Sequence, residues 1–298
     1  MITYFIDTFV VLLPLFILMA GGWIMGAAFS IHEDTLTRIL VDFFVPLLVF
    51  GSLYRSDITP SEMADLLGTV IFMVFALYGS ALLYSRIAGI DIRGFAMPVI
   101  FMNSGFLGIP LMKLWSGESA MNIIIVFDQI QTLFIFTLGF FIVGGGFTLK
   151  GLKLSLFSPI LWAVLLGFSA NLLTIGLPTV LIDTCSFAGD AAPPLAAFVV
   201  GCSLSSKKPY VDRHIIGGII LRMGVGLLIG LASVVIFDLQ GLTKTVVIVA
   251  SALPAAVFSY VLPSRYGAET AHAQNIVVIT TILSIITIPL TFALARMV

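Results

Sequence analysis

Long runs of apolar residues recur along the whole chain and are separated by short polar connections. A helix that crosses the hydrocarbon core of a bilayer takes roughly 20 residues, so the pattern predicts about ten such spans. They lie near residues 5–28, 36–54, 64–87, 95–115, 119–143, 156–176, 186–204, 214–237, 243–263 and 271–295. The sequence therefore predicts an all-α integral membrane protein embedded in a lipid bilayer.

The composition supports this interpretation. Hydrophobic residues make up 60% of the 298 residues and charged residues only 10%, against about 45–50% and about 25% in soluble domains. The formal net charge is −1, from 14 Lys and Arg against 15 Asp and Glu. This balance excludes the basic surface of a nucleic-acid-binding protein.

The distribution of Lys and Arg predicts the orientation of the chain. With ten spans, the odd-numbered connections carry 9 of these residues and the other face, with both termini, carries 4. Cytoplasmic loops are enriched in Lys and Arg. We therefore expect both termini on the non-cytoplasmic side, in a bacterial inner membrane.

The two halves of the chain share a short pattern. Asp42–Phe50 and Asp190–Phe198 both read Asp-x-x-x-Pro-Leu-x-x-Phe, at an offset of 148 residues. Because each half has five spans, an odd number, the second half must be inverted relative to the first, as in many secondary transporters. We expect one five-helix repeat over residues 1–148 and an inverted one over 149–298, joined by a glycine-rich linker that begins at Gly144.

Helix-breaking residues fall in the corresponding spans of the two halves. The fourth span contains Asn103–Pro110, with two glycines and a proline, and the ninth contains Ala252–Ala256 around Pro254. Proline removes a helical hydrogen bond, and non-helical backbone in a bilayer is tolerated only where protein or a water-filled cavity satisfies it. The pattern predicts that both spans are broken and cross at the midplane, around a binding site. The alternative is that these residues merely kink packed helices.

A broken span exposes the N-terminus of a half-helix, whose free N–H groups favour an anion. Two such ends would hold a small organic anion such as a carboxylate without a fixed cationic side chain. The candidate substrate-binding residues are Asn103, Ser104, Gly105, Gly108, Pro110, Gln131, Pro254 and Ala255.

Acidic residues within apolar spans are candidates for proton coupling: Asp128, Asp42 and Asp190. A charge at the centre of a membrane helix costs about 2.5–3.5 kcal/mol or more. Burial disfavours the charged form of a carboxyl group, and a charged carboxylate beside the site would repel an anionic substrate. Proton binding and anion binding would therefore favour each other. For Asp42 the alternative is an ion pair with Arg38, four residues earlier.

Other classes of protein remain to be weighed against a transporter. The sequence has no metal-ligand spacing, phosphate-binding loop or nucleophile–base arrangement, so neither an intramembrane enzyme nor a cofactor is expected. A passive channel is a further alternative to a transporter. A homodimer is an alternative to a monomer, because lipid-facing and subunit-facing apolar surfaces look alike in sequence.

Three segments carry a resemblance to a known family: Asn103–Met112, Val45–Phe50, and the stretch from Ala252 to Tyr266. Together they resemble the auxin efflux carrier family, which includes plant PIN-type auxin transporters and bacterial carriers of small dicarboxylates such as malonate. The resemblance covers essentially the whole chain.

The resemblance implies ten spans in two inverted repeats, crossing breaks in the fourth and ninth, and elevator-like alternating access. It implies a substrate contact at Asn103, and it matches Gln131 and Thr137 to polar family positions in the fifth span. Val49 stands where plant members have a polar residue, and the short linker is similar to that of the bacterial branch. A sodium-coupled carrier of the bile-acid-transporter type, whose fold is similar, is the alternative function.

Overall fold

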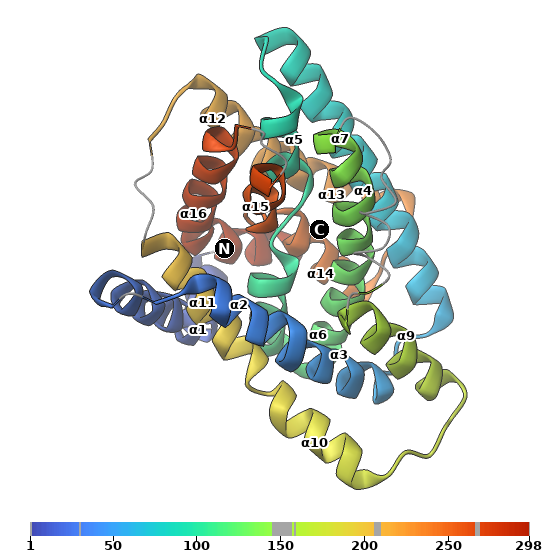
Figure 1. Cartoon of the computed structure of the whole chain (residues 1–298). Coiled ribbons are helices and arrows are strands. Elements are labelled where there is room, and N and C mark those ends of the chain that lie inside the picture. Colours follow the sequence, from blue (N-terminus) through green and yellow to red (C-terminus); the bar gives the residue numbers. More distant parts are fainter. Residues whose placement is uncertain are drawn as a thin grey trace.

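A computed structural model describes residues 2–29, 31–144, 157, 159–205, 210–265 and 269–297, and almost all of them are helical (Figure 1). The helices are α1 (Ile2–Ala28), α2 (Glu33–Ile39), η1 (Leu40–Phe44), α3 (Val45–Tyr54), α4 (Pro60–Ala88), α5 (Ile92–Ile100), η2 (Ser104–Gly108), α6 (Ile109–Phe134), η3 (Ile135–Gly139), α7 (Phe140–Gly144), α9 (Pro159–Leu172), α10 (Thr179–Gly189), α11 (Ala192–Ser205), α12 (Arg213–Ile219), η4 (Ile220–Val225), α13 (Gly226–Ile236), α14 (Gly241–Ser251), α15 (Phe258–Arg265) and α16 (Ala271–Ala295), where η marks a π-helical turn. The predicted linker after Gly144 and the predicted boundary between residues 148 and 149 lie outside the described residues.

The described helices have the length and composition of membrane spans. Seven continuous helical stretches among them are long and apolar enough to cross a bilayer, and α9 and α14 are shorter apolar helices. Large apolar side chains are exposed on their outer faces, such as Phe187 at 86% and Ile87 at 78%. Water would not favour such a surface, but lipid does, so the chain is an integral membrane protein.

One predicted connection is in fact a helix. The sequence places the seventh span at 186–204, but the chain is already helical from Thr179, as α10. This helix packs along α3 and exposes Val180 and Phe187 on its outer side. Packing against α3 stabilises the helix, and lipid favours its apolar outer face.

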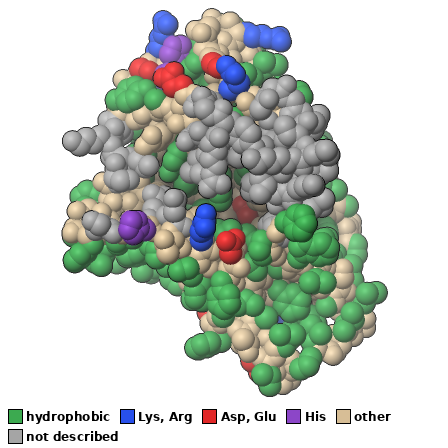
Figure 2. All heavy atoms as spheres, in the orientation of Figure 1, with side chains coloured by type: hydrophobic (Ala, Val, Ile, Leu, Met, Phe, Trp, Pro, Cys, Tyr) green, Lys and Arg blue, Asp and Glu red, His purple; other side chains and the backbone are tan. Residues whose placement is uncertain are grey.

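The helices form two groups. In the first, α1 packs against α11, and α3 packs against α9 and α10; these lie in the lower part of Figure 1. In the second, α4, α5, α6 and α12 to α16 pack mainly on one another. The groups meet where α1 contacts α16 and α6, and where α11 contacts η2 and α6. In Figure 2 the lower part is largely hydrophobic, and charged side chains gather at the top.

Glycines bring α1 and α11 into backbone contact. A Cβ atom on Gly201 of α11 would overlap the carbonyl oxygen of Met19, and one on Gly22 of α1 would overlap the carbonyl oxygen of Phe198. Small residues at a membrane helix interface allow close packing without side-chain interdigitation. This contact therefore holds the first group together through its backbones.

The N-terminus of α12 is fixed by a carboxylate outside the predicted spans. Asp212 accepts hydrogen bonds from the backbone N–H groups of His214 (2.9 Å) and Ile215 (2.8 Å), and Nε2 of His272 lies 3.0 Å from its other oxygen. Burial alone would raise the pKa of Asp212, but these hydrogen bonds and the charge of His272 bring its pKa below the ordinary value. The cap joins the starts of α12 and α16.

Candidate substrate site at two interrupted helices

The chain leaves the helical conformation in the fourth and ninth predicted spans. One interruption separates α5 from η2 and the other separates α14 from α15. Met102 and Ala255 face each other there in an antiparallel β-bridge, and the N–H of Asn103 donates to the carbonyl oxygen of Pro254 at 2.8 Å. The two interruptions therefore pair with each other through their backbones.

The first interruption lies before the glycines and proline that pointed to it. Helix resumes at Ser104, and Gly105, Gly108 and Pro110 all lie within η2 and α6. A π-helical turn precedes Pro110, and the wider turn accommodates a residue that lacks an N–H and clashes with a regular α-helix. Helical geometry ends at Ser116 and Gly117 inside α6. We call residues Ser104–Trp115 the Ser104 half-helix.

Two buried side chains complete the hydrogen bonding of the bridge. The amide of Gln131 accepts from the N–H of Met102 (3.2 Å) and donates to its carbonyl oxygen (2.7 Å). The hydroxyl of Thr280 accepts from the N–H of Ala255 (3.1 Å). Each unsatisfied backbone group would cost several kcal/mol in hydrocarbon. Gln131 was a candidate substrate contact, and in the structure its amide is already engaged by backbone.

Arg222 is a site residue that the sequence analysis missed. Its side chain is 0% exposed. Nη1 donates to the carbonyl oxygens of Val99 (2.9 Å) and Ile100 (3.1 Å), and Nη2 donates to that of Ser251 (2.6 Å). These are terminal carbonyls of α5 and α14, where helices carry partial negative charge. The available signal was an arginine in the middle of the apolar stretch Arg213–Ile236.

Asp128 lies at the start of the Ser104 half-helix. Its Oδ1 accepts a hydrogen bond from the hydroxyl of Ser104 at 2.6 Å, and its Oδ2 accepts one from Nε2 of Gln129 at 3.1 Å. The backbone of Gly105 donates a further hydrogen bond to this carboxyl group. The structure thus places an acidic side chain where the sequence predicts an anion.

Asn103 precedes the Ser104 half-helix and is 2% exposed. Its Nδ2 has no hydrogen-bond partner in the part of the chain that the structure describes. A buried donor without a partner costs roughly 1–3 kcal/mol. It is therefore available to a ligand at this end of the half-helix.

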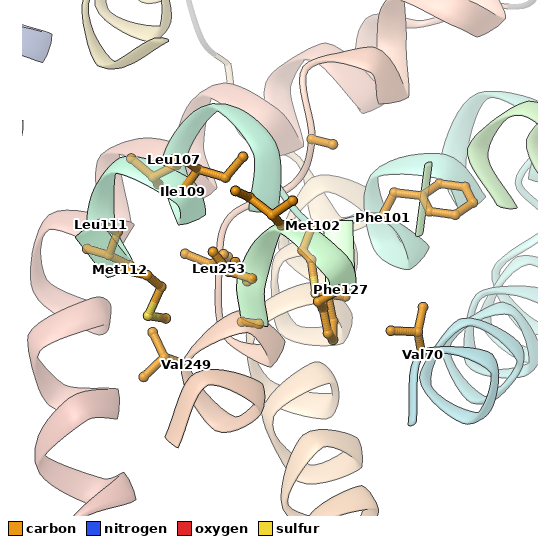
Figure 3. Close-up of a cluster of buried hydrophobic side chains, with 14 of the residues drawn as sticks. Val70, Phe101, Met102, Leu107, Ile109, Leu111, Met112, Phe127, Val249 and Leu253 are labelled. Atoms are coloured by element: carbon orange, nitrogen blue, oxygen red, sulfur yellow. The ribbon is translucent and has the colours of Figure 1, made fainter. Parts of the chain in front are cut away.

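The remaining candidates lie in the apolar core around the two interruptions. A Cβ on Gly108 would lie 3.1 Å from side-chain atoms of Ile124 and Leu253. Figure 3 shows Leu253 among the side chains of Met102, Met112 and others from the second group of helices. Gly108, Pro110 and Ala255 are buried in this apolar cluster.

The other two acidic candidates lie away from Asp128's hydrogen bonds. Asp42 is exposed on η1, and no ion pair joins it to Arg38, although the structure describes both residues. The side chain of Asp190 is 65% exposed and forms an ion pair with Lys113. This pair links the first group of helices to the Ser104 half-helix, because Asp190 lies between α10 and α11.

The chain is similar in sequence to known membrane transporters. The model of a family described as "Membrane transport protein" matches residues 7–145 and 147–292. An uncharacterized transporter of Methanothermobacter thermautotrophicus is 28% identical to the chain, over 93% of this chain and 95% of its own length. The uncharacterized transporter YfdV of Escherichia coli is 22% identical over the full length of both. A putative malonate transporter of Rhizobium meliloti is 25% identical, over 85% of this chain and 84% of its own length.

Proposed function

The chain belongs to the membrane transport protein family of auxin efflux carriers, and we propose that it is a proton-coupled secondary transporter of a small organic anion. As a member of a transporter family it is not an enzyme. The cargo class that we propose is a mono- or dicarboxylate. The relative named a putative malonate transporter supports a dicarboxylate as the first to test.

The observation that carries the proposal is the polar end of the Ser104 half-helix. Ser104, the backbone of Gly105 and the unpartnered amide of Asn103 are donors that gather at one helix N-terminus. Such an end attracts a carboxylate through its N–H groups and dipole. Of the sequence candidates, Asp128 is the acid in direct contact with it, so we assign proton coupling to Asp128 rather than to Asp42 or Asp190.

The proposed architecture is ten spans in two inverted repeats, with the interrupted fourth and ninth spans crossing at the midplane. Gln131 and Thr280 support this plan, because each accepts a hydrogen bond from a backbone N–H in the interruption of the preceding span. They lie 149 residues apart, close to the 148-residue offset between the halves. Transport would be of the elevator type, with the second group of helices moving against the first. Both termini would face away from the cytoplasm, as the Lys and Arg distribution predicts.

The test is uptake of radiolabelled malonate by the purified protein in proteoliposomes. We expect saturable uptake that a proton gradient stimulates and a sodium gradient does not, with protein-free liposomes as the blank. Counterflow of labelled against unlabelled malonate would distinguish a carrier from a channel. Uptake of no mono- or dicarboxylate, or uptake that follows sodium alone, would refute the proposal.

A further inference from the structure

We propose that the carboxylate of Asp128 is a built-in occupant of the anion position at the Ser104 half-helix, and that a substrate carboxylate binds in its place. This inference rests on the proposed function and adds how the substrate is held and released. In the structure the position is filled by the protein's own acid. The substrate binds only when the Asp128 side chain leaves this position.

The contacts of Asp128 are those of a bound anion. The hydroxyl of Ser104 and the backbone of Gly105 donate to it at the first turn of a helix that continues to Trp115. Gly105 permits the approach, because a Cβ there would lie 3.2 Å from both carboxylate oxygens. A larger residue at this position would crowd any carboxylate held there.

A second observation points to an external ligand rather than to a helix cap alone. The Nδ2 group of Asn103 is buried and unpartnered beside the same turn. Asp128 satisfies the hydroxyl of Ser104 but leaves this donor unused. A substrate carboxylate has the same two oxygens without a tether to α6, and can reach a donor that Asp128 does not engage.

The position is open on one side. Gly105, Phe106 and Asp128 are half-buried, whereas Ser104 and Leu107 on either side are buried. The ring of Phe106 stacks on that of Phe258 from α15, with centroids 6.2 Å apart. An anion could thus reach the half-helix without unfolding it.

Few other charges are available to the site. Several elements contact η2 and α6. Three of them have no charged residue: α3, α9 and α11. The charged residues of the others are Asp7 of α1, Glu62, Asp65 and Arg86 of α4, Lys244 of α14, and Lys113 and Glu118 of α6 itself. None of them hydrogen-bonds to Asp128, whose described partners are Ser104, Gly105 and Gln129.

The exchange couples a proton to the substrate. Two carboxylates cannot share the donors, because like charges at contact repel strongly in a medium of low dielectric constant. When a proton from the aqueous side binds the Asp128 carboxylate, the neutral acid can leave the helix end, and the substrate carboxylate takes the donors. The net charge at the helix end is then the same before and after binding.

The first experiment uses formate, the smallest carboxylate, as a free replacement for the side chain. Asp128→Ala in the full-length purified protein vacates the position. We expect formate to raise the Tm of this variant in a saturable way, since a ligand of the folded state stabilises it. Glu118→Ala removes a carboxylate from an exposed position on the same helix but keeps Asp128, so at alkaline pH its rise should be smaller than that of Asp128→Ala. An equal response of the two variants would overturn the proposal.

The second experiment keeps the shape of the side chain. In Asp128→Asn we expect formate to raise the Tm equally at acidic and alkaline pH, whereas in the wild type the rise is larger at acidic pH. The same pH dependence in both proteins would overturn the proposal. Both experiments read stability rather than flux, so loss of the formate effect is distinguishable from absence of malonate transport, which would refute the proposed function instead.

Discussion

Replacing Arg222 with Met tests whether the buried guanidinium holds the two interrupted helices together. The change removes the donors to three carbonyl oxygens, those of Val99, Ile100 and Ser251. A buried acceptor left unsatisfied costs roughly 1–3 kcal/mol. For three acceptors the loss is roughly 3–9 kcal/mol. The variant also avoids the cost of burying a charge, which offsets several kcal/mol of that loss. We therefore expect a net destabilisation of about 3 kcal/mol.

The assay is thermal unfolding of the purified protein in detergent. If each kcal/mol lowers Tm by about 2–4 °C, as in chains of 150–250 residues, the expected drop is roughly 6–12 °C. Arg222→Lys should give a smaller drop, because a lysine keeps the charge but lacks the planar fork that reaches several carbonyls.

The matched control is Arg55→Met. Arg55 is exposed and pairs with Asp183 at 3.5 Å, and an exposed pair contributes about 0–1 kcal/mol. A Tm for Arg222→Met that equals or exceeds that of the wild type would refute the reasoning, because the carbonyls would then be satisfied without the arginine.

Three further changes test other contacts by the same thermal assay. Gln131→Leu removes the partner of the Met102 N–H and one of the donors to the Met102 carbonyl oxygen, which still accepts from the N–H of Ser104. It should therefore lower Tm, whereas Thr281→Val, whose hydroxyl bonds only within its own helix, should not. Gly201→Val should separate α1 from α11 and cost at least about 1–3 kcal/mol, and a neutral result would refute the close packing. Asp212 has a lowered pKa when folded, so its contribution is present above the unfolded pKa of about 3.9 and is lost as pH falls through the folded value. Asp212→Asn should therefore lower Tm more at neutral pH than near pH ~3; an equal effect at both would contradict the assignment.

The apolar pattern predicted an all-helical membrane protein and the approximate places of its helices. Among the described residues, seven helical stretches are long and apolar enough to cross a bilayer, whereas α9 and α14 are shorter. The exception is α10, which the pattern divided between a connection and a span. Its helical start depends on packing against α3, more than a hundred residues away in sequence, and no local pattern encodes that contact.

The interruptions were predictable in number and approximate place, but not in detail. Pro254 lies within its interruption, whereas Pro110 lies in helix after a π-helical turn. Sequence shows that a proline disfavours regular helix; it does not show whether the chain breaks or widens its turn. Gln131 was among the sequence candidates, but as a substrate contact rather than as a partner of the Met102 backbone.

The partners of Arg222 could not be predicted. They are backbone carbonyls, which every residue has, so no residue type marks them. Asp42 illustrates the opposite case. Its position in an apolar span predicts burial, yet η1 turns it outward, because the π-helical turn changes which residues share a face. Asp190 likewise pairs with Lys113 through tertiary structure alone.

The exchange at the Ser104 half-helix is tested most directly by counting protons taken up when malonate binds. Titration calorimetry of the wild type and of Asp128→Asn, in two buffers of different ionisation enthalpy, gives that number. The account predicts uptake that approaches one proton per malonate for the wild type at alkaline pH and none for the variant. Equal uptake by the two proteins, or binding to the wild type without proton uptake, would contradict it.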